Sequence, residues 1–505
     1  MFAQAAGLPV HLGTLFEAVR ELLKVYPDIG PDDIFIHNDP FTGSSHQADI
    51  AVARPMYAGG QFLGLALNRG HWIDVGGMAA GGWGAGSRHT VQEGIRFTWL
   101  RLSKAGTLNQ ELKTIIQANI RKPKESWGDL EAQIAACRAA EARMIEAVNR
   151  YGLDGFFGGV DYILSYSKRR LEAAIRKLPE GVYEGRESVE DDGAGNGPFD
   201  LTARVTVADG RIHVDLTQAS PQAAGPINCT WYLTRGAVFA SLKAVLDPEL
   251  PLDSAVLDVI SVEGRPGTWV YAHYPAPVFS GTGDPVFHIS EAVVQALGDV
   301  APARVPATSF LSGLNVTGSG FDPRDGAEFV WYNYGCGGCG ARYNADGNSV
   351  LWHLMAPCKN ESMEVWERRF PVRYVRFELR ADSGGRGQYR GGLGFRKEWQ
   401  LLVNHTVNAV QDSHLTGSRG RCGGGPGAPN GLLFCIDGIW GDARRHFGTI
   451  SPSKLDNVSV PAGSIVAVCA VGGGGYGDPA LRRPESVKHD LEYGYSTSVD
   501  EADRE

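Results

Sequence analysis

Two histidines and two aspartates near the start of the chain have a spacing that suits metal binding. They are Asp39, the pair His46 and Asp49 separated by two residues, and His71. Imidazole and carboxylate side chains are ligands of divalent transition metals, and a site with three or four of them can leave room for a water or a substrate oxygen. The spacing therefore indicates a metal site in the N-terminal part of the chain.

A β-hairpin would position two of these residues. The segments 51–57 and 61–69 have the composition of strands, and Ala58-Gly59-Gly60 between them is a plausible tight turn. Asp49 and His71 lie at almost equal distances from this turn. We therefore expect them to face each other at the open end of the hairpin.

His46 and Asp39 lie in the polar loop that enters the first strand, and such a loop can bend both side chains toward the same point. A structural role is the alternative for each. A histidine at a strand end is more often a satisfied surface or core residue, and an aspartate in Asn-Asp-Pro usually forms a turn through hydrogen bonds to nearby backbone. Spacing alone leaves both possibilities open.

Several longer motifs are distributed over the whole chain. They are NDPFTGSSHQADI, NRGHWIDVGGM, VQEGIRF, PINCTWYLTRGAV, GGCGARYNADG, ADSGGRGQYRGGLGFR, GGGGYGDP and RRPESVKHDLEYGYSTSVDEA. Together they resemble the hydantoinase B family, which includes the C-terminal half of oxoprolinases and the large subunits of acetone and acetophenone carboxylases. Motifs in one order over essentially the whole chain are more specific than any single one.

The resemblance implies a role for each candidate ligand. In acetone carboxylase the metal is held by a His-x-x-Asp pair and by a second histidine after the next strand, and His46, Asp49 and His71 match this pattern. Asp39 would be a fourth ligand. Asp74 matches the family's His-x-x-Asp-Val-Gly-Gly run, where it could bind the metal or orient an imidazole from behind. These residues leave zinc, manganese and iron open as the metal.

The resemblance also implies the B-type (beta) subunit of an ATP-dependent hetero-oligomer. A partner of the hydantoinase A type, with an actin-like ATPase fold, would bind ATP and Mg and phosphorylate an oxygen of the small-molecule substrate. We expect ring-opening hydrolysis of a cyclic amide such as a hydantoin, oxoproline or a lactam. A subunit of an ATP-dependent ketone carboxylase is the alternative, and a non-catalytic scaffold with a structural metal is a third hypothesis.

The resemblance raises one expectation about the start of the chain. Family members have a further N-terminal segment, and MFAQAAGLPVHLGT resembles an internal stretch of them. We therefore expect a shortened N-terminus. The substrate, the metal and the subunit stoichiometry stay open at this stage.

Composition excludes several classes of protein. The net charge of -9 without a basic cluster argues against nucleic acid or an anionic membrane as a partner. No apolar run is long enough to span a membrane and no signal peptide is visible, so we expect a cytoplasmic protein. In that compartment the eight scattered cysteines would be reduced. The Cys336-Gly-Gly-Cys339 motif could be redox-active or half of a zinc site, but its glycine-rich context favours a loop without either role.

The order of predicted elements indicates an α+β fold, with a multi-layer, β-rich body, an N-terminal metal-site hairpin and a helical segment. We divide the chain into three regions: 1–180 with the hairpin and helices, 181–305 of mixed α/β character, and 306–505, rich in β-strands and glycine turns and ending in a charged tail. Predicted helices include 129–150 and 162–177.

Glycine-rich stretches are the other unusual feature, as in 335–340, 384–394, 417–427 and 472–477. None of them contains the GxxxxGK[ST] pattern of a phosphate-binding loop. We therefore expect turns and close backbone approach rather than an ATP site. The tail from Arg482 is expected to be solvated or to clasp a neighbouring subunit.

Overall fold

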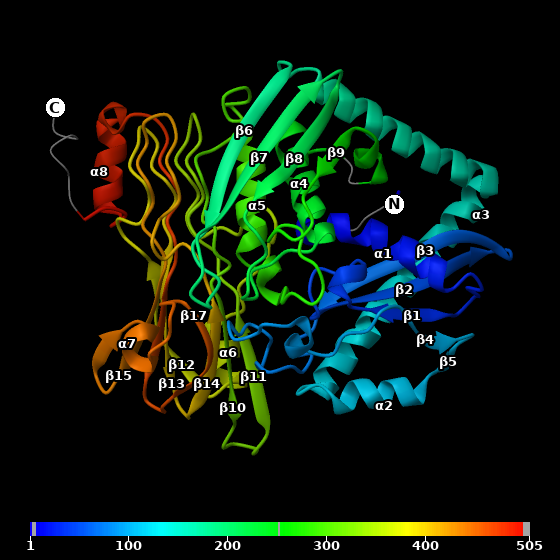
Figure 1. Cartoon of the computed structure of the whole chain (residues 1–505), viewed down its shortest axis with the longest axis horizontal. Helices are drawn as coiled ribbons and strands as arrows, with labels where there is room; N and C mark the ends of the chain where they lie inside the picture. The colour runs from blue at the N-terminus through cyan, green and yellow to red at the C-terminus, as the bar shows by residue number, and fades with distance from the viewer. Residues whose placement is uncertain (3–6, 251–252, 498–505) are drawn as a thin grey trace.

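The chain folds into three consecutive groups of β-strands with helices packed around them, as Figure 1 shows. The computed structural model describes residues 1–2, 7–250 and 253–497. Its sheets lie within 34–108, 181–263 and 315–469. The expected α+β class is confirmed, and the division into three regions stays a prediction.

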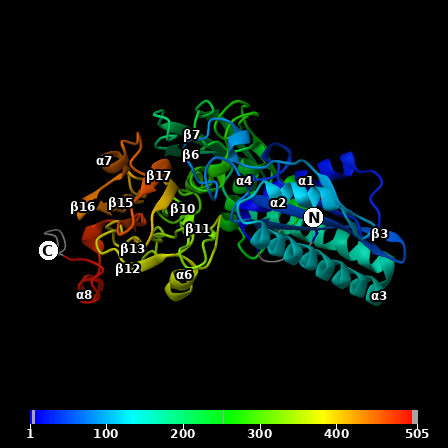
Figure 2. The same cartoon turned by 90° about the horizontal axis from the view of Figure 1, so that it is seen from below.

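The N-terminal sheet has the strand order β3-β2-β1-β4-β5. Its strands are β1 (Ile34–His37), β2 (Asp49–Ala58), β3 (Gln61–His71), β4 (Leu100–Lys104) and β5 (Thr107–Leu108), and its helices are α1 (Leu12–Val25), α2 (Gln110–Ala118) and α3 (Pro123–Ile175). Helix α3 packs along β2 and β3 (Figure 2). Leu130 and Cys137 of α3 share a core with Ile50 and Val52, which fixes the hairpin from one side.

Helix α3 differs from the sequence prediction, which separated 129–150 from 162–177. The structure has one long element with a single non-helical residue, Gly152, at φ 72°. Glycine adopts positive φ without the steric cost that other residues meet, so the chain can kink there and continue as a helix. The glycines around this point weakened the helical pattern in the sequence without ending the helix.

The middle region consists of a four-stranded sheet and two buried helices. The sheet has the order β6-β7-β8-β9, and β9 is parallel to β8. Its elements are β6 (Gly181–Val189), β7 (Phe199–Ala208), β8 (Arg211–Ala219), β9 (Ile260–Glu263), α4 (Trp231–Leu246) and α5 (Pro285–Ala296). Helix α5 packs on β6 and β7, and both helices contribute to the largest apolar core.

The C-terminal region is a pair of sheets with a common core. One has the order β11-β10-β14-β17 and the other β12-β13-β18-β15-β16. The strands are β10 (Asn315–Phe321), β11 (Glu328–Asn333), β12 (Val372–Leu379), β13 (Phe395–Leu401), β14 (His405–Val410), β15 (Gly431–Ile436), β16 (Ile439–Gly441), β17 (Lys454–Val460) and β18 (Ile465–Cys469). Trp331 of one sheet and Trp399 of the other lie 6.2 Å apart between ring centroids. The sheets therefore pack face to face.

Three short helices complete this region: α6 (Met363–Arg369), α7 (Ala443–Phe447) and α8 (Pro484–Glu492). The tail that contains α8 packs on the rest of the chain up to residue 497, and residues 498–505 lie outside the described part. Arg482 lies 2.8 Å from Asp346 and 2.7 Å from Asp490, and Asp490 also pairs with Arg390 at 3.2 Å. These ion pairs attach the tail to its own chain.

The glycine-rich stretches of the C-terminal region lie against one another. The amide of Gly338 donates to Val471, that of Gly385 to Gly473, and that of Gly475 to Gly425, at 2.8 to 2.9 Å. A Cβ atom on Gly473 would lie 1.9 Å from the carbonyl oxygen of Cys339, far inside van der Waals contact. Close backbone approach, as expected from the sequence, is what these glycines permit.

Within the described residues, no helix is long and apolar enough to cross a membrane.

Candidate metal centre and cavity

The hairpin of β2 and β3 holds Asp49 and His71 opposite each other. Gly59 and Gly60 have φ of 55° and 83° and form its two-residue turn between the paired residues Ala58 and Gln61. Positive φ at both turn positions matches the right-handed twist of the two strands, and glycine supplies it. The register shifts once, between Met56 and Tyr57, and at the open end Asp49 is the partner of His71, so the expected hairpin and its pairing are confirmed.

His46 reaches the same point from the loop before β2. Its Nε2 atom lies 3.1 Å from Oδ2 of Asp49, and its ring centroid lies 5.0 Å from that of His71. Phe279 packs edge-on against the imidazole at 4.5 Å. The Nδ1 atom is buried and has no hydrogen-bond partner. A buried ring nitrogen without a partner is unfavourable unless a ligand completes it.

Sequence reasoning missed a third histidine, His11. Its Nδ1 lies 3.7 Å from Oδ2 of Asp49 and 3.2 Å from the hydroxyl of Ser45, which also donates to Asp49. His11 directly precedes helix α1, which packs near the hairpin loop. The signal in the sequence is the run Pro9-Val10-His11 before an amphipathic helix, which alone does not distinguish a ligand from a helix cap.

Asp39 lies in the same loop but turns away from this group. Its carboxylate accepts from the amide of Phe41 at 3.0 Å and pairs with Arg96 at 3.1 Å. This is the turn-forming role that the Asn-Asp-Pro context allowed. The geometry therefore gives no support for Asp39 as a fourth ligand.

Asp74 also makes contacts other than those the resemblance implied. It accepts from the amides of Gly76, Gly81 and Arg121 and pairs with the Arg121 guanidinium at 3.0 Å. These bonds organise the loop after β3. Its hydrogen bonds go to backbone amides and Arg121 rather than to an imidazole.

Burial and mutual contacts shift the pKa values of His11, His71 and Asp49. Burial lowers the pKa of both His11 and His71 to about 4, so both imidazoles are neutral at pH 7 and keep a lone pair. Burial opposes ionisation of Asp49, but the nearby imidazoles, His46 foremost, hold the pKa of its carboxyl well below the usual range. The two neutral imidazoles of His11 and His71 and the ionised carboxylate of Asp49 have the protonation states that metal ligation requires.

His11, His46, Asp49 and His71 line one end of a cavity of about 340 Å³. Aromatic side chains from the N-terminal and C-terminal regions form much of the remaining wall: Trp83, Tyr332, Tyr334, Trp352, Trp366 and Tyr374. Tyr332 stacks on His71 at 5.7 Å and on Trp83 at 5.4 Å. A volume of this size with mostly apolar walls accommodates a small organic molecule next to the histidines.

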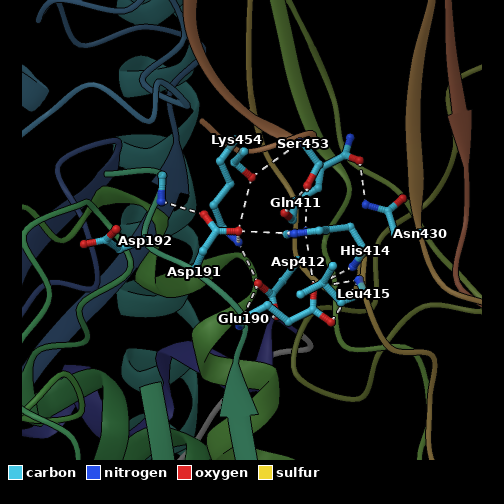
Figure 3. A network of polar contacts seen from close by, with 12 residues as sticks. Glu190, Asp191, Asp192, Gln411, Asp412, His414, Leu415, Asn430, Ser453 and Lys454 are labelled. Carbon is cyan, nitrogen blue, oxygen red and sulfur yellow. Dashed lines mark hydrogen bonds and ion pairs between the residues drawn. The ribbon is translucent and has the colours of Figure 1, made fainter. Parts of the chain in front are cut away.

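A second group of possible metal ligands lies between the middle and C-terminal regions (Figure 3). Among the residues that the structure describes, Glu190, Asp412 and His414 are the one set whose ligand atoms all lie within 4.8 Å of one another. Asp412 already pairs with Lys454 at 2.6 Å, and Glu190 accepts from the backbone amides of residues 414–416. Because Lys454 supplies the positive charge, these contacts explain the group as a structural network.

The cysteines give no sign of a second centre. All eight lie in the described part of the chain and are free thiols. Burial raises the pKa of Cys339 to about 11 and that of Cys336 above its usual value. Both thiols are therefore protonated at neutral pH.

The fold and the cavity define a class of large α+β chain with a buried histidine and carboxylate centre. The chain belongs to the hydantoinase B/oxoprolinase family, whose model matches residues 1–479. The resemblance noted from the motifs is thereby confirmed.

Several known proteins are similar over nearly the whole chain. The beta subunit of the caprolactamase of Pseudomonas jessenii is 31% identical over 96% of this chain and 84% of its own length. The crystal structure of ATP-dependent caprolactamase from the same organism has a TM-score of 0.88 at 27% identity, over 99% of this chain and 87% of that one. The B-type subunit of a putative D-/L-hydantoinase of Pseudomonas sp. (strain NS671) is 29% identical over 98% of this chain and 83% of its own.

A nucleotide-free structure of acetone carboxylase shares the fold. Its TM-score is 0.87 at 20% identity, over 97% of this chain and 71% of that one. At that identity the likeness concerns the fold alone.

Proposed function

We propose that this chain is the B-type (beta) subunit of an ATP-dependent hydrolase that opens a cyclic amide: a hydantoin, oxoproline or a lactam. One observation supports this proposal most directly. This chain is similar along its length to a caprolactamase beta subunit of the same family, and it has a buried group of histidines and a carboxylate at the end of a ligand-sized cavity. An A-type ATPase subunit would be its partner in a hetero-oligomer. The relatives that are named as the beta or B-type subunits of their enzymes support such a partner.

The residues at the centre fit a divalent transition metal, held by His46, Asp49 and His71 with His11 next to them. The unpartnered Nδ1 of His46 and the neutral imidazole of His71 supply lone pairs, and Asp49 supplies the negative charge. Zinc, manganese or iron bound there would polarise a substrate oxygen or lower the pKa of a water. Ser45 and His11 fix the orientation of the Asp49 carboxylate.

The reaction divides between two subunits. The partner binds ATP and Mg and transfers a phosphoryl group to the amide oxygen. In this chain's cavity a first water adds its oxygen to the amide carbon, the C–N bond breaks and the ring nitrogen takes up the two protons of that water, which leaves an acyl phosphate. A second water hydrolyses the acyl phosphate to a carboxylate and inorganic phosphate. Tyr332 stacks on His71, Trp83 stacks on Tyr332, and these rings keep bulk water from the reacting carbon. A cytoplasmic location, where ATP is available, is part of this proposal.

Reconstitution with an ATPase subunit tests the function. The complex, given ATP, heavy-oxygen water and a panel of hydantoin, oxoproline and lactam, should release a linear amino acid derivative with the label in its new carboxylate. His71→Ala should abolish release while the circular dichroism spectrum stays unchanged. Labelled bicarbonate incorporated into a ketone, with no ring opening across the panel, would replace the hydrolase by the alternative ketone carboxylase.

A further inference from the structure

A buried lysine lines the same cavity far along the chain from the histidines. Lys397 lies in β13 between Phe395 and Trp399, and only 4% of it is exposed. Its ammonium donates to Oδ1 of Asn333 at 3.0 Å. Both side chains belong to the cavity wall.

The charge of Lys397 has no counter-ion in the described part of the chain, where no carboxylate lies within ion-pair distance of it. The cavity wall contains two carboxylates: Asp49, at the histidines, and Glu361, which pairs with Arg369 at 2.8 Å. Burial lowers the pKa of Lys397 to about 8. An unpaired buried ammonium is strongly unfavourable, and a hydrophobic residue of the same volume would be more stable there.

Aromatic rings offset part of this cost. The ammonium lies 4.7 Å from the ring centroid of Phe377, 5.2 Å from that of Phe395 and 5.5 Å from that of Trp399. Cation–π contacts stabilise a cation less than an ion pair does in the same surroundings. The rings hold the ammonium in place, and its positive charge remains available to a ligand.

Asn333 adds a second donor beside the lysine. Its Oδ1 atom accepts from Lys397, which assigns its Nδ2 atom as the donor end of the amide. That Nδ2 is buried and has no hydrogen-bond partner. A free amide donor and a cation with hydrogen-bonding capacity to spare suit an acceptor with two oxygens.

We propose that Lys397 and Asn333 form an oxyanion subsite that binds a phosphate or carboxylate group of the molecule in the cavity. Under the proposed function, on which this step rests, two anions come into question: the phosphoryl group placed on the amide oxygen, and the carboxylate of a substrate or ring-opened product. Either has two oxygens for the two donors. The subsite holds the molecule by its charge while its reacting carbon faces the histidines.

Binding to the isolated full-length chain tests the subsite without ATP or a partner. The probes are inorganic phosphate and acetate, followed by calorimetry or by the fluorescence of the wall residues Trp352 and Trp366. Lys397→Met should weaken binding of the preferred anion at least tenfold, because it removes the charge and keeps the volume. Asn333→Asp should weaken it similarly, because a carboxylate replaces the donor. A preference for phosphate identifies the phosphoryl group as the ligand, and one for acetate identifies a carboxylate.

Two control variants make the result specific. Lys359 is an exposed lysine that also borders the cavity, and Lys359→Met should change the affinity less than twofold. His71→Ala should retain the Lys397-dependent binding, because His71 is not part of the subsite, and loss of that binding would overturn the assignment to Lys397 and Asn333 alone. The thermal midpoint of Lys397→Met should not fall, which distinguishes loss of a ligand contact from unfolding.

The proposal is overturned if neither anion binds, or if Lys397→Met binds as well as wild type. It is also overturned if Lys359→Met loses as much affinity as Lys397→Met, because the effect would then follow net charge. Failure of the ring-opening assay with Lys397-dependent anion binding intact would reject the proposed function and leave the subsite standing.

Discussion

Asp49 and His71 are cross-strand partners in the ladder of β2 and β3, so the backbone of a hairpin sets their separation. His46 lies in a loop and contacts Asp49 at 3.1 Å. Two of the three proposed ligands are therefore held by a regular element whose other side packs on helix α3. Removing an imidazole there should change the chemistry without breaking the sheet.

The first prediction concerns metal content. The purified chain should contain about one transition metal ion, since the proposed centre has three ligands, His46, Asp49 and His71. His71→Ala should lose most of it in elemental analysis. Asp39→Asn is the matched control and should keep its metal, because Asp39 bonds Phe41 and Arg96 instead. Equal metal in wild type and His71→Ala would remove His71 from the ligand set.

The second prediction concerns ATP. No phosphate-binding loop is present in the sequence, so the isolated chain should neither bind nor hydrolyse Mg-ATP. Calorimetric titration with Mg-ATP measures this directly, and the mixture with an ATPase subunit is the positive control. Saturable binding to the isolated chain would contradict the division between two subunits.

The third prediction concerns stability. The pKa of Lys397 is about 8 in the folded chain and 10.5 in the unfolded chain, so the unfolded state binds more protons between these values. The destabilisation is complete below pH 8 and disappears as pH rises toward 10.5. Lys397→Met should therefore raise the free energy of unfolding at pH 7 by about 1–3 kcal/mol, and by less at pH 9. Denaturant titration at both pH values measures the difference, and lower stability at pH 7 would indicate a structural lysine.

The fourth prediction concerns the pH dependence of anion binding. The groups that face the ammonium are the Asn333 amide, the rings of Phe377, Phe395 and Trp399, and the thiol of Cys336, whose pKa burial raises. Affinity for phosphate should therefore be constant from pH 7.5 to about 8 and fall about tenfold per pH unit above it, as Lys397 loses its proton. Repeating the titration at each pH gives the profile. A flat profile to pH 10 would exclude the lysine as the binding cation.

The fifth prediction compares two glycines. Gly473→Ala should lower the free energy of unfolding by more than about 3 kcal/mol, because its methyl group would meet the carbonyl of Cys339 at 1.9 Å. Gly128 lies in helix α3 with nothing within 4 Å of an added Cβ. Gly128→Ala should be stabilising by about 0.5–1 kcal/mol. Thermal or denaturant unfolding of the two variants, with opposite signs expected, provides the measurement.

The parts of the fold and of the candidate metal centre that could be predicted are those encoded by residues close together in the sequence. The hairpin has strand-like segments on both sides of a Gly-Gly turn, so the approximate pairing of Asp49 and His71 could be predicted. Strict counting from Ala58 and Gln61 would place Gly70 opposite Asp49, and the register shift between Met56 and Tyr57 moves the pairing to His71. Helix α3 was divided because glycines near Gly152 interrupt the apolar pattern, while its packing on β2 and β3, invisible in the sequence, keeps it one element. The sequence around Asp39 fits both a turn-forming and a metal-binding aspartate. The ion pair with Arg96, which only the structure shows, favours the turn.

The far wall of the cavity could not be predicted in the same way. Lys397 and Asn333 lie on different strands, more than 250 residues from His71, and no local spacing relates them to it. A weak signal exists: Lys397 alternates with Phe395 and Trp399, which places a lysine on the buried face of a strand. This alternation points to a cavity residue only once it is known that β13 faces both a second sheet and the cavity.

The crossing of glycine-rich segments near Gly338, Gly392 and Gly473 reverses the usual meaning of such composition. Repetitive glycine is normally associated with loose linkers that accept almost any replacement. Here the absence of a side chain is what the fold requires, because a Cβ at Gly338 or Gly392 would lie 2.0 Å or less from a backbone oxygen. These glycines are therefore among the most constrained residues of the chain. A complete substitution scan should find fewer permitted replacements at them than in the aromatic wall of the cavity.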